Sequence, residues 1–187
     1  MKLTDIDFAD DAFKTCVLET AAKAEVENAE DLVELRCRKQ GIENAAGIEF
    51  LTGLKLLDLT RNELSKLDLS SNVLLEEVFV GNNELSALDV SGCRALTHLE
   101  VFINELDELD LSNNPLLEEL YANKNDLEAI DLSQNKELVD IRLSGNELSD
   151  INLSANDKLQ RLEMEMNPLT DAARTMMSKL ESAQVQL

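Results

Sequence analysis

The sequence predicts a solenoid of short parallel strands with a helical cap at each end. A leucine-rich segment of about 21 residues recurs along most of the chain, and its first leucine falls at Leu54, Leu75, Leu96, Leu117, Leu138 and Leu159. An asparagine recurs at the same interval, at Asn62, Asn83, Asn104, Asn125, Asn146 and Asn167. A short, constant period is typical of solenoids, in which each copy buries its apolar side against the next.

We predict that residues 1–31 form the N-terminal cap. We expect a helix over residues 5–24, because aspartates crowd its start, where the helix dipole favours negative charge. Apolar residues at three- and four-residue spacing give this helix one face that can cover the end of the leucine core, namely Phe8, Phe13, Cys16, Val17 and Ala21.

We predict that residues 32–169 form about seven repeats. The first repeat is degenerate and carries Gln40 where later copies carry asparagine. The first part of each copy is expected to be a strand, with every second side chain pointing outward. Outward positions of successive copies should form columns along the stack, and the first regular copy contributes Leu56, Asp58 and Thr60 to these outward columns. The recurring asparagine should end the strand and bond the backbone of the bend.

A second apolar pair in each copy, such as Leu109 and Leu111, predicts another extended segment on the opposite wall. After Asn167 the period is lost, and we expect residues 170–187 to form a C-terminal cap helix. Its apolar face is predicted to contain Ala173, Met176, Met177, Leu180 and Leu187. The alternative is an amphipathic helix that binds a partner.

The charge of the chain excludes several kinds of partner. With 38 acidic and 17 basic residues the formal net charge is −21, which repels nucleic acids and anionic membrane surfaces. No apolar run reaches the roughly 20 residues that span a bilayer, so we expect no membrane insertion. The first residues, MKLTDIDFADDAF, have no basic start and no continuous apolar region, and they predict no signal peptide.

The repeats match the pattern LxxLxLxxN over nearly all of residues 32–169, and a second element LDLS or LDVS follows. The chain therefore resembles bacterial leucine-rich-repeat proteins of the internalin type. The segments FKTCVLE, LRC and GIEFLTGLKLLDL are similar to the cap of secreted members of that class. The resemblance implies a leucine-rich-repeat solenoid that binds a protein through its concave strand face, but the fold alone does not specify a site.

The outward residues of the first strands are the candidate binding residues, because leucines account for the inward positions. Aromatic side chains are rare in this chain, yet several fall on the outward side of successive copies. The candidates are Phe79, His98, Glu100, Phe102, Tyr121 and Arg142. Acidic neighbours such as Glu77 and Glu119 favour a partner with a basic surface. Alternatively, these rings only cover the strands, and the chain is a structural spacer or surface coat. We expect a monomer.

Four aspartates form a ladder on the second element, at Asp68, Asp89, Asp110 and Asp131, and Asn152 follows them. Carboxylates about 5 Å apart repel one another, so we expect each to raise the pKa of its neighbours. A calcium ladder is one interpretation of this column. We favour local bonds from the aspartate and the following serine to the backbone.

The three cysteines fall into two groups. Cys93 stands in a column otherwise held by asparagine, and we expect it to be a buried turn residue. Cys16 and Cys37 either pair as the cap helix packs on the stack or remain two buried thiols. A disulfide indicates an oxidising compartment, which favours a secreted, periplasmic or surface protein over a cytoplasmic one.

The sequence gives little support to catalysis. His98 is the only histidine, no nucleophile is visibly paired with it, and no glycine-rich loop can hold a phosphate. We therefore expect no enzyme activity, no metal and no cofactor. A hydrolase that uses two carboxylates is the remaining alternative, and in so acidic a chain suitably spaced pairs arise by chance.

Overall fold

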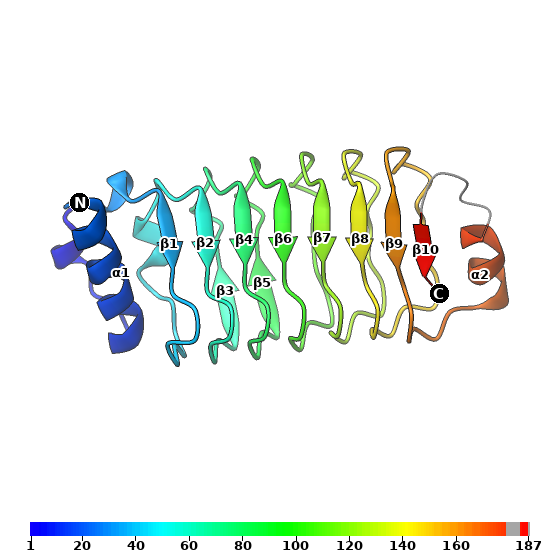
Figure 1. The fold of residues 1–187 in the computed structure, drawn as a ribbon, viewed down its shortest axis with the longest axis horizontal. Coiled ribbons are helices and arrows are strands. Elements are labelled where there is room, and N and C mark those ends of the chain that lie inside the picture. Colours follow the sequence, from blue (N-terminus) through cyan, green and yellow to red (C-terminus); the bar gives the residue numbers. More distant parts are fainter. Residues whose placement is uncertain (179–183, 187) are drawn as a thin grey trace.

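The computed structural model describes residues 1–178 and the backbone of residues 184–186, and it shows a rod of stacked coils with a helix at either end (Figure 1). In this described part, the front of the rod is one parallel sheet of eight strands. In stacking order they are β1 (Glu34–Arg36), β2 (Leu56–Asp58), β4 (Glu77–Phe79), β6 (His98–Glu100), β7 (Glu119–Tyr121), β8 (Asp140–Arg142), β9 (Arg161–Glu163) and β10 (Gln184–Gln186).

Corresponding residues of successive copies are paired in this sheet, so that Leu57 lies beside Val78 and Val78 beside Leu99. The repeat period therefore becomes columns of like side chains along the rod. The predicted solenoid of short parallel strands is confirmed. We call the outward side chains of β1, β2, β4, β6, β7, β8 and β9, and of the two residues that follow each of these strands, the strand face.

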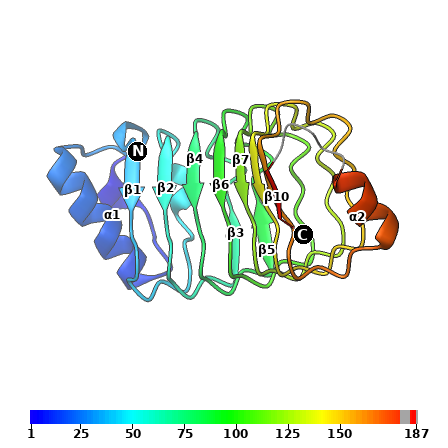
Figure 2. The same cartoon turned by 45° about the vertical axis from the view of Figure 1, so that its right-hand side comes forward.

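A second wall lies behind the sheet (Figure 2). It begins with β3 (Lys66–Asp68) and β5 (Ala87–Asp89), which pair in parallel. Residues 108–110, 129–131 and 150–152 continue this wall in later copies without forming a regular strand. We call these five segments the back wall. The predicted second extended segment is therefore confirmed, but regular strand pairing is restricted to its first two copies.

The core fills the space between the two walls and consists mainly of leucine. Leu57, Leu99 and Leu120 are fully buried, and the corresponding residues of the other copies are equally inaccessible. Burying one such side chain contributes roughly 2 kcal/mol to folding. Because each leucine packs on the copies before and after it, the stacked repeats stabilise one another.

Each regular coil also contains a buried asparagine beside the strand. In the copy of β7, Asn125 Oδ1 accepts a hydrogen bond from the Leu106 amide at 3.2 Å, while Nδ2 donates to the carbonyls of Val101 and Ala122. The predicted bonding of this side chain to the backbone of the bend is confirmed. We call Asn62, Asn83, Asn104, Asn125, Asn146 and Asn167 the strand-side ladder.

The N-terminal cap is built around α1 (Asp11–Ala24), which packs against β1. The predicted start at residue 5 was wrong. The helix begins only after Asp10, because the Asp10 side chain accepts a hydrogen bond from the Phe13 amide at 2.8 Å and so caps the first turn. Phe8 lies before the helix, and its ring meets Phe13 edge-on at 5.6 Å. The short turns η1 (Leu3–Asp5), η2 (Ala29–Asp31) and η3 (Ile48–Phe50) complete this end.

The cap helix is joined to the first coil by a disulfide between Cys16 and Cys37. Their sulfur atoms are 2.06 Å apart and their Cα atoms 5.9 Å apart. Cys37 directly follows β1 and is fully buried, so the bond connects α1 to the end of the core.

The C-terminal helix α2 (Asp171–Met177) is shorter than the helix predicted over residues 170–187. Thr170 caps its start by accepting from the Ala173 amide at 3.1 Å. Residues 184–186 form β10 beside β9, which covers backbone groups that would otherwise be an open sheet edge. Ala173 and Met177 are buried as predicted, but Met176 is exposed. Leu180 and Leu187 lie outside the described residues. No helix in the described part is long and apolar enough to span a bilayer.

Candidate functional site

Four predicted binding residues form a continuous row on the strand face. The ring centroids of Phe79 and His98 are 5.0 Å apart, and His98 meets the Tyr121 ring edge-on at 5.2 Å. The Arg142 guanidinium lies 3.9 Å from the centroid of the Tyr121 ring, within the range of a cation–π contact. These residues come from β4, β6, β7 and β8, whose in-register stacking brings them together. We call Phe79, His98, Tyr121 and Arg142 the aromatic row.

Two carboxylates hold the imidazole of His98 within this row. Its Nε2 lies 3.1 Å from Glu100 and its Nδ1 lies 3.0 Å from Glu119. Burial is the largest influence on the pKa of His98 and lowers it, but the bond to Glu100 and the charge of Glu119 together outweigh burial and raise the pKa above its usual value. The protonated ring can donate to both carboxylates at once.

Tyr121 and Arg142 are held in a similar way. The Tyr121 hydroxyl donates to Glu119 at 2.7 Å, and Arg142 Nη2 donates to that hydroxyl at 3.1 Å and to Asp140 at 2.8 Å. Burial and the bond to Glu119 raise the pKa of Tyr121, so the ring stays neutral. The aromatic row is thus a preformed, half-buried surface in which the rings and charges are fixed by their neighbours.

Phe102 lies beside the row. Its ring covers the backbone of the preceding coil at Gly81, where an added Cβ would lie 2.7 Å from the ring. Phe102, Tyr121, Arg142 and Glu163 line a shallow hollow of about 380 Å³. All six predicted binding residues, Glu100 included, therefore occur on one stretch of the strand face.

Asp58 and Thr60, which were predicted in the outward columns, are buried. Asp58 pairs with Arg38 of the degenerate first copy at 3.1 Å, and its other oxygen accepts from the Thr60 amide. The register also places Phe79 next to Asp58 in the sheet. Outward side chains are therefore covered by their column neighbours at this end of the strand face.

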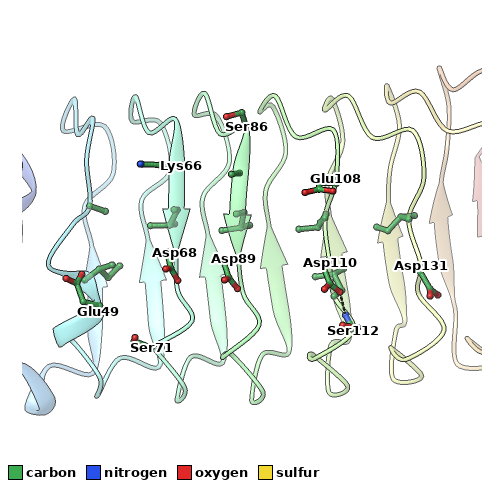
Figure 3. A pocket seen from close by; sticks show the side chains of 18 of the residues that line it. Glu49, Lys66, Asp68, Ser71, Ser86, Asp89, Glu108, Asp110, Ser112 and Asp131 are labelled. Atoms are coloured by element: carbon green, nitrogen blue, oxygen red, sulfur yellow. Dashed lines mark hydrogen bonds between the residues drawn. The ribbon is translucent and has the colours of Figure 1, made fainter.

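The back wall carries a larger hollow that sequence reasoning missed. A groove of about 1140 Å³ follows the stacking axis from the first coil to the copy that contains residues 129–131 (Figure 3). Its floor is apolar and is formed by Leu67, Leu88, Leu109 and Ile130. The signal in the sequence was the column before these residues, where small Ala87 and Ala129 alternate with Lys66 and Glu108. We call this feature the back groove.

The aspartate ladder lies along one side of the back groove (Figure 3). Each aspartate accepts a bond from the amide two residues later, for example Asp110 from Ser112 at 2.9 Å, which confirms the predicted local bonding. The predicted rise in pKa was wrong. Hydrogen bonds from the following serine lower the pKa of Asp68, Asp110 and Asp131, because these bonds outweigh the desolvation of each carboxylate and, at Asp131, the repulsion from Asp110. Within residues 1–178, no group of three His, Cys, Asp or Glu side chains is arranged to hold a metal ion.

Solved structures with the same architecture are leucine-rich-repeat proteins of bacteria. The functional domain of InlJ from Listeria monocytogenes, whose description notes a cysteine ladder, superposes with a TM-score of 0.70 and 30% identity over 91% of this chain and 44% of that one. Internalin C2 from Listeria monocytogenes gives 0.64 and 20% identity over 100% of this chain and 96% of its own. YopM from Yersinia enterocolitica gives 0.57 and 25% identity over 64% of this chain and 26% of its own.

The chain thus spans less than half of the InlJ domain. The likeness to internalin C2 concerns the fold alone. No protein-family model and no curated protein sequence matches the chain. Stacked repeats of this kind form an extended concave surface, which repeat proteins use for binding.

Proposed function

From the premise that this chain is a leucine-rich-repeat solenoid similar to internalin-type proteins, we propose that it is a non-catalytic module that binds a protein through its strand face. The observation that supports this proposal is the aromatic row. Three rings and a guanidinium lie in contact on one face of a chain whose aromatic content is only 3%. Tyrosine and arginine are enriched among the residues that dominate binding energy at protein interfaces.

The fixed geometry of the row favours binding. The imidazole of His98 and the guanidinium of Arg142 are each held by a carboxylate at about hydrogen-bond distance. A partner does not have to order these side chains, which lowers the entropic cost of association. The strand face thus offers a rigid, half-exposed platform.

The charge around the row indicates the chemistry of the partner. Glu77 is exposed beside His98, and Glu163 lies next to Arg142 in the sheet. The whole chain carries a net charge of −21. A partner with a basic, partly apolar surface is therefore attracted over a distance of about one Debye length, roughly 8 Å at physiological salt.

The cap disulfide supports an extracytoplasmic location for this function. A bond between Cys16 and Cys37 persists in an oxidising compartment such as the periplasm or the cell surface. We therefore propose an exported, monomeric binding module.

Affinity capture with the immobilised protein tests the proposal. Phe79→Ser, Phe102→Ser and Tyr121→Ser are combined in one variant, whose fold is checked by circular dichroism. We expect wild type to retain a partner that the folded triple variant does not retain. Equal retention by both proteins would show that the strand face is not the binding surface.

One observation favours a second candidate function, that of a structural spacer. The charged groups of the aromatic row are paired with one another, as in the contacts of Arg142 with Asp140 and Tyr121. Such pairing can stabilise an exposed sheet without any ligand. This candidate predicts that no captured protein depends on strand-face residues, and that the triple variant loses stability but no binding.

A further inference from the structure

We infer that the back groove is a second docking surface, separate from the strand face, and that it takes a basic amphipathic α-helix. The groove combines an apolar floor with a row of carboxylates on one side (Figure 3). An apolar floor alone accepts many partners. The charges and the spacing of this groove favour one kind of partner, a basic helix.

The floor of the groove is incompletely covered by the protein itself. Leu67 and Leu109 are buried, whereas Leu88 and Ile130 are only partly buried. The preceding positions, Ala87 and Ala129, have side chains too short to cover them. Apolar side chains of a ligand can therefore reach Leu88 and Ile130 and remove their exposed surface from water.

The acidic groups of the groove lack partners of opposite charge. Its lining contains six carboxylates, those of Glu49, Asp68, Asp89, Glu108, Asp110 and Asp131, and one basic residue, Lys66. Within residues 1–178 none of these seven side chains forms a salt bridge. The strand face differs, because most of its carboxylates pair with a basic side chain, for example His98, Arg142 or Arg161. The back groove thus presents an unbalanced negative field to a ligand with several positive charges.

The spacing of the aspartates favours a helix. Successive coils are about 4.8 Å apart, the distance between paired strands. A helix that lies along the groove brings a side chain to the same face about every 5.4 Å. Basic residues one turn apart can thus follow Asp68, Asp89, Asp110 and Asp131 in order. The groove covers about five coils, or roughly 19 Å, which corresponds to a helix of about 13 residues at a rise of 1.5 Å per residue.

An extended peptide fits the back wall less well. Strand addition requires unpaired backbone groups along the groove. The amides of neighbouring coils already bond one another, for example Leu69 to Asp89 at 2.8 Å and Ser86 to Ser65 at 2.9 Å. A second copy of this chain is disfavoured by its own net charge of −21.

The experiment uses a fluorescent helical peptide of about 14 residues, with leucines on one face and lysines on the other, and measures its anisotropy with the full chain. In the groove variant all four ladder aspartates become asparagine. Asn152 shows that this change keeps the local turn, because its Oδ1 accepts from the Ser154 amide at 3.0 Å. The matched control removes four charges from another exposed ladder by Glu63→Gln, Glu84→Gln, Glu105→Gln and Glu147→Gln.

We expect one peptide per chain, and a loss of affinity of about tenfold or more in the groove variant, with a much smaller loss in the control. A peptide of the same composition with leucines and lysines alternating should bind more weakly than the helical one. Equal losses in both variants would indicate general attraction to an acidic protein and overturn the inference. So would equal binding of the two peptides, no binding at all, or a dimer of the chain that the groove variant dissociates. The Phe79, Phe102 and Tyr121 triple variant should bind the peptide normally, which separates this site from the proposed function.

Discussion

Buried asparagines form one ladder on the strand side of the coils and a second ladder on the back side, and the two ladders differ in one hydrogen bond. On the strand side, Asn125 Oδ1 accepts from a backbone amide and Nδ2 donates to two carbonyls. On the back side, Asn135 Nδ2 also donates to two carbonyls, but its Oδ1 has no hydrogen-bond partner within residues 1–178. The same holds for the other members of the back-side ladder, Asn72, Asn114 and Asn156.

The difference explains which ladder tolerates substitution. The strand-side asparagine is the partner of a buried amide, so a residue without an acceptor at that depth leaves the amide unpaired. The back-side asparagine only adds donors to carbonyls that other amides also reach. Cys93 occupies this second ladder, and its thiol donates to the Leu69 carbonyl at 3.4 Å. Burial, with the nearby charges of Asp89 and Asp68, raises the pKa of Cys93 to about 12, so the thiol remains protonated.

The same contrast extends to the two surfaces. Most strand-face charges, with exceptions such as Glu77, are paired inside the protein, whereas the carboxylates of the back groove form no salt bridge within residues 1–178. The repeat thus builds one wall on which most charges are paired within the protein and one on which the carboxylates are left for the solvent or a ligand.

The largest expected effect is on the strand-side ladder. Asn125→Ala removes the acceptor of the Leu106 amide, and we expect it to lower the free energy of unfolding by about 3 to 5 kcal/mol. Asn135→Ala should cost only about 1 to 3 kcal/mol, because the Leu111 and Asn114 carbonyls keep other donors. Urea unfolding measures both. Equal losses of unfolding free energy in the two variants would mean that the hydrogen bond accepted by the strand-side Oδ1 does not make that ladder more important for stability.

A smaller effect is expected from single charges on the two walls. Arg142→Ala removes the cation–π contact with Tyr121 and the pair with Asp140, and we expect a loss of about 1 kcal/mol. Lys66→Ala, on the back wall, should change the free energy of unfolding by less than about 0.5 kcal/mol. Thermal or urea unfolding of the two variants provides the comparison. A similar cost at both positions would contradict the assignment of paired and unpaired walls.

The pH dependence of stability should separate the walls. The raised pKa of His98 means that its contribution is complete below the unfolded value of about 6.5 and is lost as pH rises through the folded pKa. The lowered pKa values of Asp68 and Asp131 mean that their contribution is present above 3.8 and is lost as pH falls through the folded values. Urea midpoints measured from pH 2 to 9 should therefore show two separate steps. His98→Gln should remove the step near neutral pH and leave the acid step, and a neutral step that survives would exclude His98 as its source.

A small effect is also expected at Cys93. Cys93→Asn restores the residue of the back-side ladder, whose Nδ2 can then reach the Leu69 carbonyl. We expect the free energy of unfolding to change by less than about 1 kcal/mol, because one weak donor is replaced by a stronger one in a similar volume. Differential scanning calorimetry is sufficient to detect a larger change. A loss above that range would show that Cys93 has a packing role asparagine cannot fill.

Much of the fold could be predicted because the period imposes identical environments on corresponding residues. Inward leucines and the strand-side asparagines follow from that period alone. The proximity of Phe79, His98 and Tyr121 was also predictable, since in-register stacking brings neighbouring copies to strand spacing. The exact partners of His98 were not, because they depend on side-chain rotamers.

The back groove, the pKa of Asp110 and the last strand could not be predicted, because they depend on properties other than the repeat period. The back groove arises from the small volumes of Ala87 and Ala129 relative to their column neighbours, so it appears only when the copies are compared in three dimensions. The pKa of Asp110 is lowered by hydrogen bonds from Ser112 that outweigh the desolvation of the carboxylate, and the period does not reveal these bonds. The strand at residues 184–186 follows a segment without repeats, and there the open edge of β9 decides the structure.

The most direct test of the strand-face account uses the only histidine of the chain, which lies inside the aromatic row. Protein labelled with ¹⁵N and ¹³C at histidine gives a single ring signal from His98, free of overlap from an unlabelled partner. During titration with the protein recovered by affinity capture, we predict that this signal shifts or broadens and saturates together with binding. A His98 signal that stays unchanged while the partner is fully bound would contradict the account.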